Sequence, residues 1–562
     1  MAVTKPQLRQ VPLRSAGNPQ GSSLSRRYRH VMHGICTLAV ALACSIAVPA
    51  EAAERLILKL GPFEQSVPIA DLEAFANTGE LSPALKPFGV ILTPQVQQLL
   101  SRRLQIDPNM IDKFVNDHLR TTDGQRLINR LGVALPGSTI EELQAAIFLA
   151  ARQVDGLSVV GFLRAYPEER VTVDASSALA IAIQFNASYL QSQALGPILE
   201  RELTVPTENS FRATFDPAAE GNQWVNQNTV VLRDRSRQRT IPIDIYSSQN
   251  SSGPLVVISH GFGSDRRFLT YLGRHLASHG LTVVSLEHPG SNITWLTDVS
   301  VSDNPSDLLP ASEFLDRPKD VSFVLDKLAQ FNQEDGFWQG RFNTQQVSII
   351  GHSLGGYTAL SLAGAELNLD ELRQFCQNRS PLGRSPADWF QCAAADLPND
   401  KIQLRDPRIV QVLALNTISG RLFGKNGLAK VSVPTLILTG TEDAVTPSLD
   451  HQLRVFQQLN PGSKYLLSAI GGTHLSVTDP DNLNKSLTQS TLVKENIGEE
   501  TAPLRQLVRG VSLAFIKQLT PEAEIYQPFL TPAYAQSLST PQIALRLNTE
   551  FTASMEAWLN LL

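Results

Sequence analysis

The chain has little of several features that would assign it to a common functional class. Its 562 residues carry a formal net charge of −5 and contain no block of basic residues, which is unfavourable for binding nucleic acid. They also contain no glycine-rich phosphate loop, no dinucleotide-binding fingerprint and no histidine cluster with metal-ligand spacing. We therefore expect a protein without a cofactor or a bound metal, and without nucleic acid as a partner.

The sequence also lacks an apolar run that is long enough for a confident membrane span. A short apolar stretch at about residues 35–48 follows three arginines at 26, 27 and 29 and precedes an A-x-A cleavage site at Ala50–Ala52. This order of a basic region, an apolar region and small residues is typical of a secretory signal. We expect a signal peptide over residues 1–53, export to the periplasm or the extracellular space, and no transmembrane segment in the mature chain. Lipid anchoring at Cys44 remains an alternative.

Cysteine is scarce, with four residues in the whole chain. Cys36 and Cys44 leave with the expected signal peptide, and the remaining pair, Cys376 and Cys392, cannot by itself make a structural zinc site. An oxidising compartment is compatible with a disulfide between them, and two buried free thiols are the alternative. Both lie in an expected insertion at about 366–405, so we hypothesise a cap pinned by a disulfide near the acyl site.

What the chain does contain is a strand-like run that ends in a G-x-S-x-G turn, at residues 347–356. A helix-compatible stretch follows the turn, which is the arrangement of a nucleophile elbow. The chemistry requires it, because Gly351 and Gly355 allow backbone segments to approach closely while Ser353 is held at the edge of the sheet. The sequence predicts Ser353 as the nucleophile.

The acid of a catalytic triad is expected after the nucleophile, and the base after the acid. An apolar run at 433–440 delivers a loop with Glu442 and Asp443 at the carboxyl end of a predicted strand, where ligands bind in open α/β sheets. We predict Asp443 as the acid and keep Glu442 as the alternative.

Two histidines lie beyond that loop. His474 follows the predicted last strand in a glycine-rich loop, whereas His451 opens a helix-like stretch and is interpreted as a surface helix residue. We predict His474 as the base, which takes the proton of the serine and returns it to the leaving group.

The oxyanion site is expected upstream. A buried-strand run at 255–259 ends in His260-Gly261-Phe262-Gly263. In proteins with a nucleophile elbow, such a loop supplies one backbone N–H to the oxyanion. The second N–H comes from the residue after the nucleophile. The predicted donors are therefore Phe262 and Leu354, and the side chain of His260 is interpreted as a packing or hydrogen-bonding group of the loop.

Together these motifs resemble the α/β-hydrolases, and within them the branch of platelet-activating-factor acetylhydrolases and dienelactone hydrolases. The resemblance covers roughly residues 225–480 and rests on four segments, at 260–263, 285–291, 317–326 and 351–356. It implies an α/β fold with a mostly parallel sheet and helices on both faces, and ester hydrolysis without a cofactor.

The sequence departs from both families at one position each. In the acetylhydrolase pattern the acid follows an earlier strand, here at 409–415, but the next residue is Asn416, so we place the acid at Asp443 instead. Dienelactone hydrolases use a cysteine nucleophile where this chain has Ser353.

The remaining segments give the expected domain organisation. Residues 54–200 are predicted as a mainly helical domain, opened by a hairpin, that resembles the region of unknown function before such hydrolases in some secreted bacterial proteins. The hydrolase domain is expected at 201–520, with an amphipathic helix at 502–519 that packs on the sheet. A C-terminal helical extension is expected at 521–562, with a loop-like stretch at 521–535 and a final helix at 540–562. Helical periodicity in the first domain is found at 70–76, 93–103, 108–119, 122–131, 138–151, 158–165 and 176–191.

The predicted function is that of a secreted serine hydrolase acting on carboxylic esters. The resemblance implies a small-molecule or lipid ester, of the phospholipid type or with a short acyl group, and hence a role in lipid degradation. A peptidase or thioesterase with the same triad is one alternative, and a non-catalytic secreted binding protein on the same scaffold is another. The sequence predicts no oligomeric state.

Overall fold

The computed structural model describes residues 53–561 with several gaps. The expected signal peptide at 1–53 therefore lies, apart from its last residue, outside the described residues. The gaps within the range are 61–62, 90–91, 93, 102, 104–130, 153–157, 176–186, 207–210, 213, 299–307, 378–383, 461, 463 and 483–494.

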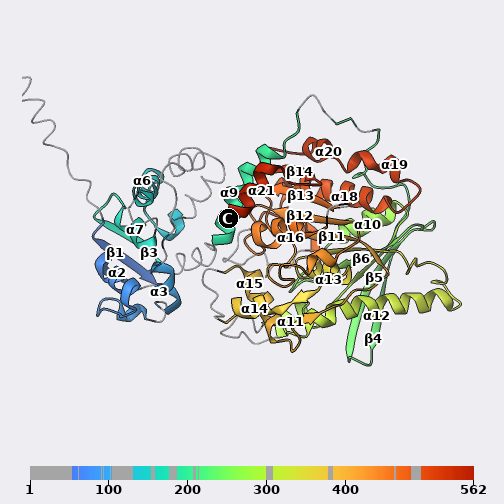
Figure 1. The fold of residues 1–562 in the computed structure, drawn as a ribbon, viewed down its shortest axis with the longest axis horizontal. Coiled ribbons are helices and arrows are strands. Elements are labelled where there is room, and N and C mark those ends of the chain that lie inside the picture. The colour runs from blue at the N-terminus through green and yellow to red at the C-terminus, as the bar shows by residue number, and fades with distance from the viewer. Residues whose placement is uncertain are drawn as a thin grey trace, which may run out of the picture.

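A large sheet forms the centre of the molecule, in the strand order β14-β13-β12-β11-β8-β6-β7-β5-β4 (Figure 1). The six strands from β13 to β7 run parallel, and β14, β5 and β4 pair antiparallel at the two ends. The strands are β4 (Asn226–Asp234), β5 (Arg239–Ser247), β6 (Leu255–Ser259), β7 (Thr282–Leu286), β8 (Val347–His352), β11 (Ile409–Leu415), β12 (Thr435–Gly440), β13 (Lys464–Ile470) and β14 (Ala544–Asn548).

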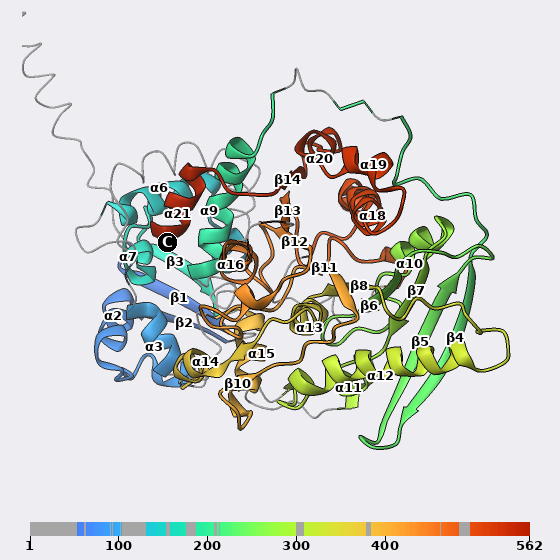
Figure 2. The same ribbon diagram turned by 45° about the vertical axis from the view of Figure 1, so that its right-hand side comes forward.

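Helices cover both faces of this sheet. Successive residues of a strand point to opposite faces, so Val257 joins one core while Val256 and Ile258 join the other. Figure 2 shows α12 and α13 on one side of the strands and α10 and α18 on the other. The helices on the first face are α9 (Ala187–Glu202), α12 (Glu313–Gln333), α13 (Leu354–Leu362), α16 (Arg454–Gln458) and α21 (Ala553–Leu561). Those on the second face are α10 (Thr270–Ser278), α18 (Ala502–Lys517), α19 (Ala523–Tyr526) and α20 (Pro532–Ser537).

This architecture confirms the predicted α/β-hydrolase fold. The apolar runs at 255–259, 347–352, 409–415, 435–440 and 464–470 all form strands of the parallel part. Because parallel strands all end at one edge, the loops that follow them come together there.

The N-terminal residues form a separate lobe with its own core, drawn in blue and cyan in Figure 1. The predicted hairpin of β1 (Arg55–Leu60) and β2 (Phe63–Pro68) is confirmed, and β3 (Arg170–Asp174), which was not predicted, pairs parallel to β1. Around this sheet lie α2 (Ile69–Thr78), α3 (Pro94–Ser101), α6 (Ile140–Ala151) and α7 (Val159–Arg164).

Some helical predictions for this region fall on residues outside the described part of the chain. These are the helices at 108–119 and, apart from its last residue, at 122–131, and the start of the helix at 176–191. The described part of the last one, α9, extends to Glu202 and contributes Leu195 and Leu199 to the core of the central sheet. Helix α9 thus crosses the expected boundary at residue 200, and the domain boundaries stay a prediction.

The C-terminal predictions were partly wrong. The amphipathic helix expected at 502–519 is α18, but the stretch at 521–535 contains α19 and α20 instead of a loop. The single helix expected over 540–562 is strand β14 followed by α21. Leu545 and Leu547 are two residues apart and both buried, as strand periodicity requires, and β14 extends the sheet antiparallel to β13.

An insertion between α13 and β11 contains the two remaining cysteines. It comprises β9 (Leu367–Asn368), α14 (Leu369–Phe375), α15 (Pro386–Ala393) and β10 (Lys401–Ile402), and a disulfide joins Cys376 to Cys392. We call this insertion the cap. The short remaining elements are α11 (Ile293–Asp298), the 3₁₀ turns at 86–88, 394–396, 428–430, 480–482, 499–501 and 527–529, and a π-helical turn at 449–453.

Within the described ranges, none of the helices is long and apolar enough to cross a membrane.

Candidate active site

Ser353 stands at the junction of β8 and α13 with a strained backbone. Its φ of 56° and ψ of −118° are rare for a residue with a side chain, and such strain is typical of functional turns. The flanking glycines are required by close contact, because a Cβ on Gly351 would lie 2.0 Å from the carbonyl oxygen of Gly355. A Cβ on Gly355 would lie 2.0 Å from the carbonyl oxygen of Ser259. The sequence thus folds locally into the predicted elbow geometry.

The loop after β12 brings Asp443 to His474, which follows β13. The Nδ1 atom of His474 lies 2.8 Å from Oδ2 of Asp443, which is fully buried. The other oxygen, Oδ1, accepts hydrogen bonds from the backbone N–H groups of Val445 (2.9 Å) and Thr446 (2.7 Å). This carboxylate is therefore held in one orientation, with one oxygen directed at the imidazole.

Two further side chains donate to the same carboxylate oxygen. The hydroxyl of Thr446 donates to Oδ2 of Asp443 at 2.6 Å, and the amide of Asn416 donates to it at 2.8 Å. Asn416 stands where the acetylhydrolase pattern has its acid. Here it orients the carboxylate from the neighbouring strand instead.

The pair shifts the protonation equilibria of both partners. Burial opposes a charge on His474, but the charge and the hydrogen bond of Asp443 outweigh it and raise the pKa of His474 above its ordinary value of 6.5. Burial also disfavours the charged form of Asp443, yet the contacts with His474 and Thr446 lower the pKa of that carboxyl. At neutral pH the carboxylate is ionised and favours the tautomer of His474 with its proton on Nδ1, which leaves Nε2 free to act as a base.

His352, next to the serine, fixes the backbone of the histidine loop. Its Nε2 donates to the carbonyl oxygen of His474 at 2.9 Å, and the two rings lie 4.6 Å apart between centroids. Burial lowers the pKa of His352 to about 3, so its ring is neutral. Residues 352 and 474 are thus held together across the sheet edge, and Ser353 directly follows His352.

The predicted oxyanion donors lie beside the elbow. Leu354 is the first residue of α13, where a helical N–H has no partner within the helix. Gly261, which precedes Phe262, comes so close to the elbow that a Cβ would lie 3.1 Å from Cβ of Ser353. Within the described part of the chain, neither the N–H of Phe262 nor that of Leu354 has a hydrogen-bond acceptor. Both groups are therefore available to an oxygen atom of a ligand.

The cap reaches the site from two directions. The ring of Phe390 on α15 packs against Phe262 with 4.6 Å between ring centroids, and the N–H of Ala387 donates to the carbonyl oxygen of Val445 at 3.1 Å. Helix α15 thus bridges the oxyanion loop and the loop that carries the acid. Ser353 and His474 are only 4% and 5% exposed.

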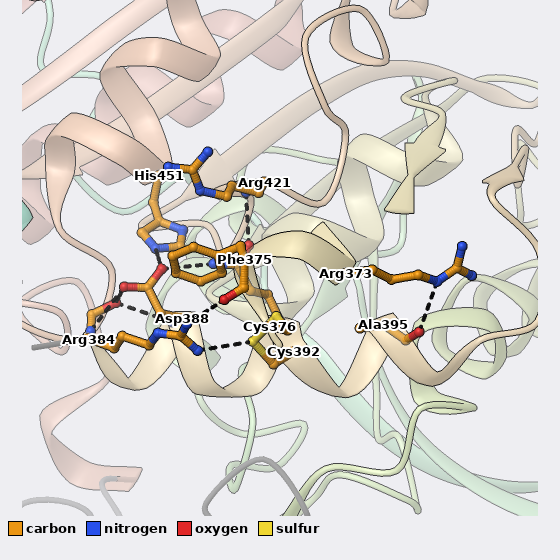
Figure 3. The surroundings of a disulfide bond; sticks show 11 residues. Arg373, Phe375, Cys376, Arg384, Asp388, Cys392, Ala395, Arg421 and His451 are labelled. Carbon is orange, nitrogen blue, oxygen red and sulfur yellow. Dashed lines mark hydrogen bonds and ion pairs between the residues drawn. A yellow bond between two sulfur atoms is a disulfide. The ribbon is translucent and has the colours of Figure 1, made fainter. Parts of the chain in front are cut away.

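The disulfide ties this helix to α14, as Figure 3 shows. On one side of it, the guanidinium of Arg384 donates to the carbonyl oxygen of Phe375 and lies over the ring of that residue. The hypothesised disulfide and cap are thus present together, next to the predicted site.

The other candidates from the sequence do not take part in the contact between Asp443 and His474. Glu442 directly precedes Asp443, but its N–H donates to the carbonyl oxygen of Gly472 and the carboxylate that meets His474 is that of Asp443. The prediction that His451 is a surface residue is wrong. Its side chain is buried at the π-helical turn, beside Asp388 of the cap (Figure 3).

Sequence reasoning missed Glu495, which lies beside the histidine loop. Its Oε2 accepts a hydrogen bond from the N–H of Leu475 at 2.8 Å, and burial raises its pKa to about 7. The neighbouring Asn496 accepts a hydrogen bond from Ser476 at 2.9 Å. The segment at 495–496 therefore braces the histidine loop, and no motif in the sequence points to it.

Comparisons with known proteins agree with this fold. Residues 255–485 match the model of an α/β-hydrolase family, and residues 52–174 match a model described as an α/β-hydrolase of unknown function. The chain thus carries α/β-hydrolase family domains.

More distant similarity extends to cutinases. Cutinase 2 of Thermobifida cellulosilytica and cutinase cut1 of Thermobifida fusca are each 22% identical over 239 residues, or 42% of this chain. The matched region spans 66% and 54% of the lengths of these two relatives.

Proposed function

We propose that the protein is a secreted serine hydrolase that cleaves carboxylic esters through an acyl-enzyme on Ser353. The observation that carries the proposal is the buried hydrogen bond of 2.8 Å between His474 and Asp443, in a loop that His352 joins to the strained elbow backbone of Ser353. A serine is a weak nucleophile by itself, and an oriented base beside it is the usual means of activation. Distant similarity to proteins named cutinases supports ester bonds as the substrate class.

The proposed reaction follows from the directions of these groups. Ser353 attacks the acyl carbon while Nε2 of His474 takes the hydroxyl proton, and Asp443 stabilises the resulting imidazolium. The N–H groups of Phe262 and Leu354 bind the oxyanion of the tetrahedral intermediate. His474 then returns the proton to the leaving alcohol, and a water molecule activated by the same base releases the acid.

The cap bears on the size of the substrate. Because α15 spans from the oxyanion loop to the acid loop and Ser353 is only 4% exposed, we propose a small or single-chain ester, of the short-acyl or phospholipid type, in preference to a polymer surface. Asn416 at the acid position of the acetylhydrolase pattern weighs against that family's own substrate.

A panel of p-nitrophenyl esters and phospholipids, given to the purified mature chain, tests the proposal with Ser353→Ala as the control. We expect hydrolysis of short-chain esters by the native chain and none by the variant. A fluorophosphonate label on Ser353 provides a readout that does not depend on the substrate. If the folded native chain neither took the label nor cleaved any ester, the rival of a non-catalytic binding protein would be favoured.

A further inference from the structure

A fully buried arginine lies beneath the loop that carries Phe262. Arg317 of α12 is 0% exposed, and its guanidinium donates to the carbonyl oxygen of His260 and to Oγ of Ser291 at 2.9 Å. Burial lowers the pKa of Arg317 to about 10, so the group stays cationic at neutral pH. An arginine without exposure requires a reason, because removing its charge from water is costly.

One carboxylate of the same helix is linked to this arginine through Ser291. Ser291, which accepts from Arg317, donates to Oε2 of Glu313 at 2.7 Å. Glu313 also pairs with Arg239 at 2.7 Å, and Asp320, one turn beyond Arg317, pairs with Arg239 at 2.7 Å. Arg317 is thus the side chain of this network that donates to a backbone carbonyl of the oxyanion loop, whereas Arg239 balances the same two carboxylates from β5.

The contacts fix two successive peptide planes. The peptide between Gly261 and Phe262 carries the N–H of Phe262 and the carbonyl oxygen of Gly261. This oxygen lies 2.6 Å from Nδ1 of His260. The preceding peptide carries the carbonyl oxygen to which Arg317 donates. Gly261 joins the two planes, and a glycine restricts their rotation less than any other residue would.

The ring of His260 is itself held in one state. Its Nε2 accepts the N–H of His288 at 3.0 Å, so the proton of the neutral ring resides on Nδ1, which donates to the carbonyl of Gly261. Burial lowers the pKa of His260 well below its ordinary value, so the ring stays neutral. Arg317 and His260 therefore hold the glycine from both sides.

We propose that Arg317 is a positioning residue for the oxyanion site: its hydrogen bond to the carbonyl oxygen of His260 fixes the peptide between His260 and Gly261, and so helps to direct the N–H of the next peptide, that of Phe262, at the reacting carbonyl. The inference rests on the proposed function. Arg317 touches no reacting atom, and its effect is on binding of the transition state rather than of the substrate.

The variant Arg317→Lys keeps the charge but loses the planar fork that reaches His260 and Ser291 together. Arg239→Lys is the matched control, because it disturbs the same carboxylates and leaves the loop contact intact. The readouts are kcat and KM for p-nitrophenyl butyrate, the inhibition constant of phenylboronic acid, which forms a tetrahedral adduct with a serine nucleophile, and the melting temperature.

For Arg317→Lys we expect kcat to fall about tenfold or more and the inhibition constant of the boronic acid to rise by a similar factor, with KM changed less than about threefold. For Arg239→Lys we expect a lower melting temperature with kcat and inhibition constant within about threefold of the native values. An unchanged kcat and inhibition constant in Arg317→Lys would overturn the inference. So would losses of kcat in both variants that are in the same proportion to their drop in melting temperature.

A third variant covers the case in which Arg317→Lys does not fold. Ser291→Ala removes the link between Arg317 and Glu313, and a weaker binding of the boronic acid with an unchanged KM supports the inference, whereas native binding refutes it. Fluorophosphonate labelling separates this inference from the proposed function. A labelled native enzyme with an unaffected Arg317→Lys variant refutes only the role of Arg317, and an unlabelled native chain refutes both.

Discussion

Replacing Asp443 by asparagine tests the acid of the proposed triad. The carboxylate receives donors on both oxygens: two backbone N–H groups on Oδ1, and the side chains of His474, Thr446 and Asn416 on Oδ2. An asparagine would keep its oxygen toward the backbone donors and would turn its NH₂ group toward the other three. Because that group cannot accept the Nδ1 proton, the imidazole would move its proton to Nε2 and could no longer accept the proton of Ser353.

The expected loss follows from this wrong tautomer. A change of this kind in a serine hydrolase lowers kcat by about 10⁴, which corresponds to roughly 5.5 kcal/mol of activation free energy. The NH₂ group would also face the NH₂ group of Asn416, now 2.8 Å from a carboxylate oxygen, so we expect unfolding to become easier by about 1–3 kcal/mol.

The assay is kcat for p-nitrophenyl butyrate at neutral pH, corrected for the folded fraction by circular dichroism. The neighbouring variant Glu442→Gln is the control, and we expect it to stay within about threefold of the native rate, because the carboxylate that meets His474 is that of Asp443. A rate within about tenfold of native in Asp443→Asn, or an equal loss in Glu442→Gln, would refute the assignment.

Four other predictions concern the surroundings of the site. The pKa of His474 is raised above 6.5 and the neutral ring is the active form, so kcat/KM should fall as the pH drops through a value above 6.5. Glu495→Gln removes a nearby negative charge that favours the imidazolium, so the pH–rate profile should show this acid limb at lower pH. His451→Ala should lower the melting temperature, because it opens a buried cavity, but kcat per folded molecule should stay within about threefold of native; a large loss would challenge the role of His474. Denatured, unreduced mature protein should show no thiol that reacts with Ellman's reagent, since Cys376 and Cys392 are joined; two reactive thiols would contradict the disulfide.

The sheet and the loops at its edge were predictable because their signals are local. Each parallel strand is an apolar run of five to seven residues, and the loop that follows it carries its polar residues within a few positions. Parallel topology then brings these loops together without any further information. For this reason Ser353, Asp443 and His474 could be proposed together from the sequence, although they lie far apart along the chain.

The two strands that the sequence did not predict, β14 and β3, can be recognised only together with the strands with which they pair. Strand β14 is short and pairs with β13 across a long stretch of chain, and its two buried leucines also fit a helical stripe when read together with the residues of α21. Strand β3 likewise pairs parallel to β1 from more than a hundred residues away. Neither pairing is visible until the partner strand has been placed.

The residues around the proposed triad differ from its members in the same respect. Asn416 was recognised only as a missing acid, because its role follows from the 2.8 Å contact with a loop from the next strand. Arg317 was noticed only within a segment of family resemblance, because its contact with the carbonyl of His260 joins a long helix to a loop 57 residues earlier. The role of a side chain that does chemistry can be recognised from its residue type and its place at a strand end. The role of a side chain that positions another one depends on which residues the fold brings into contact with it. The second kind therefore needs a structure.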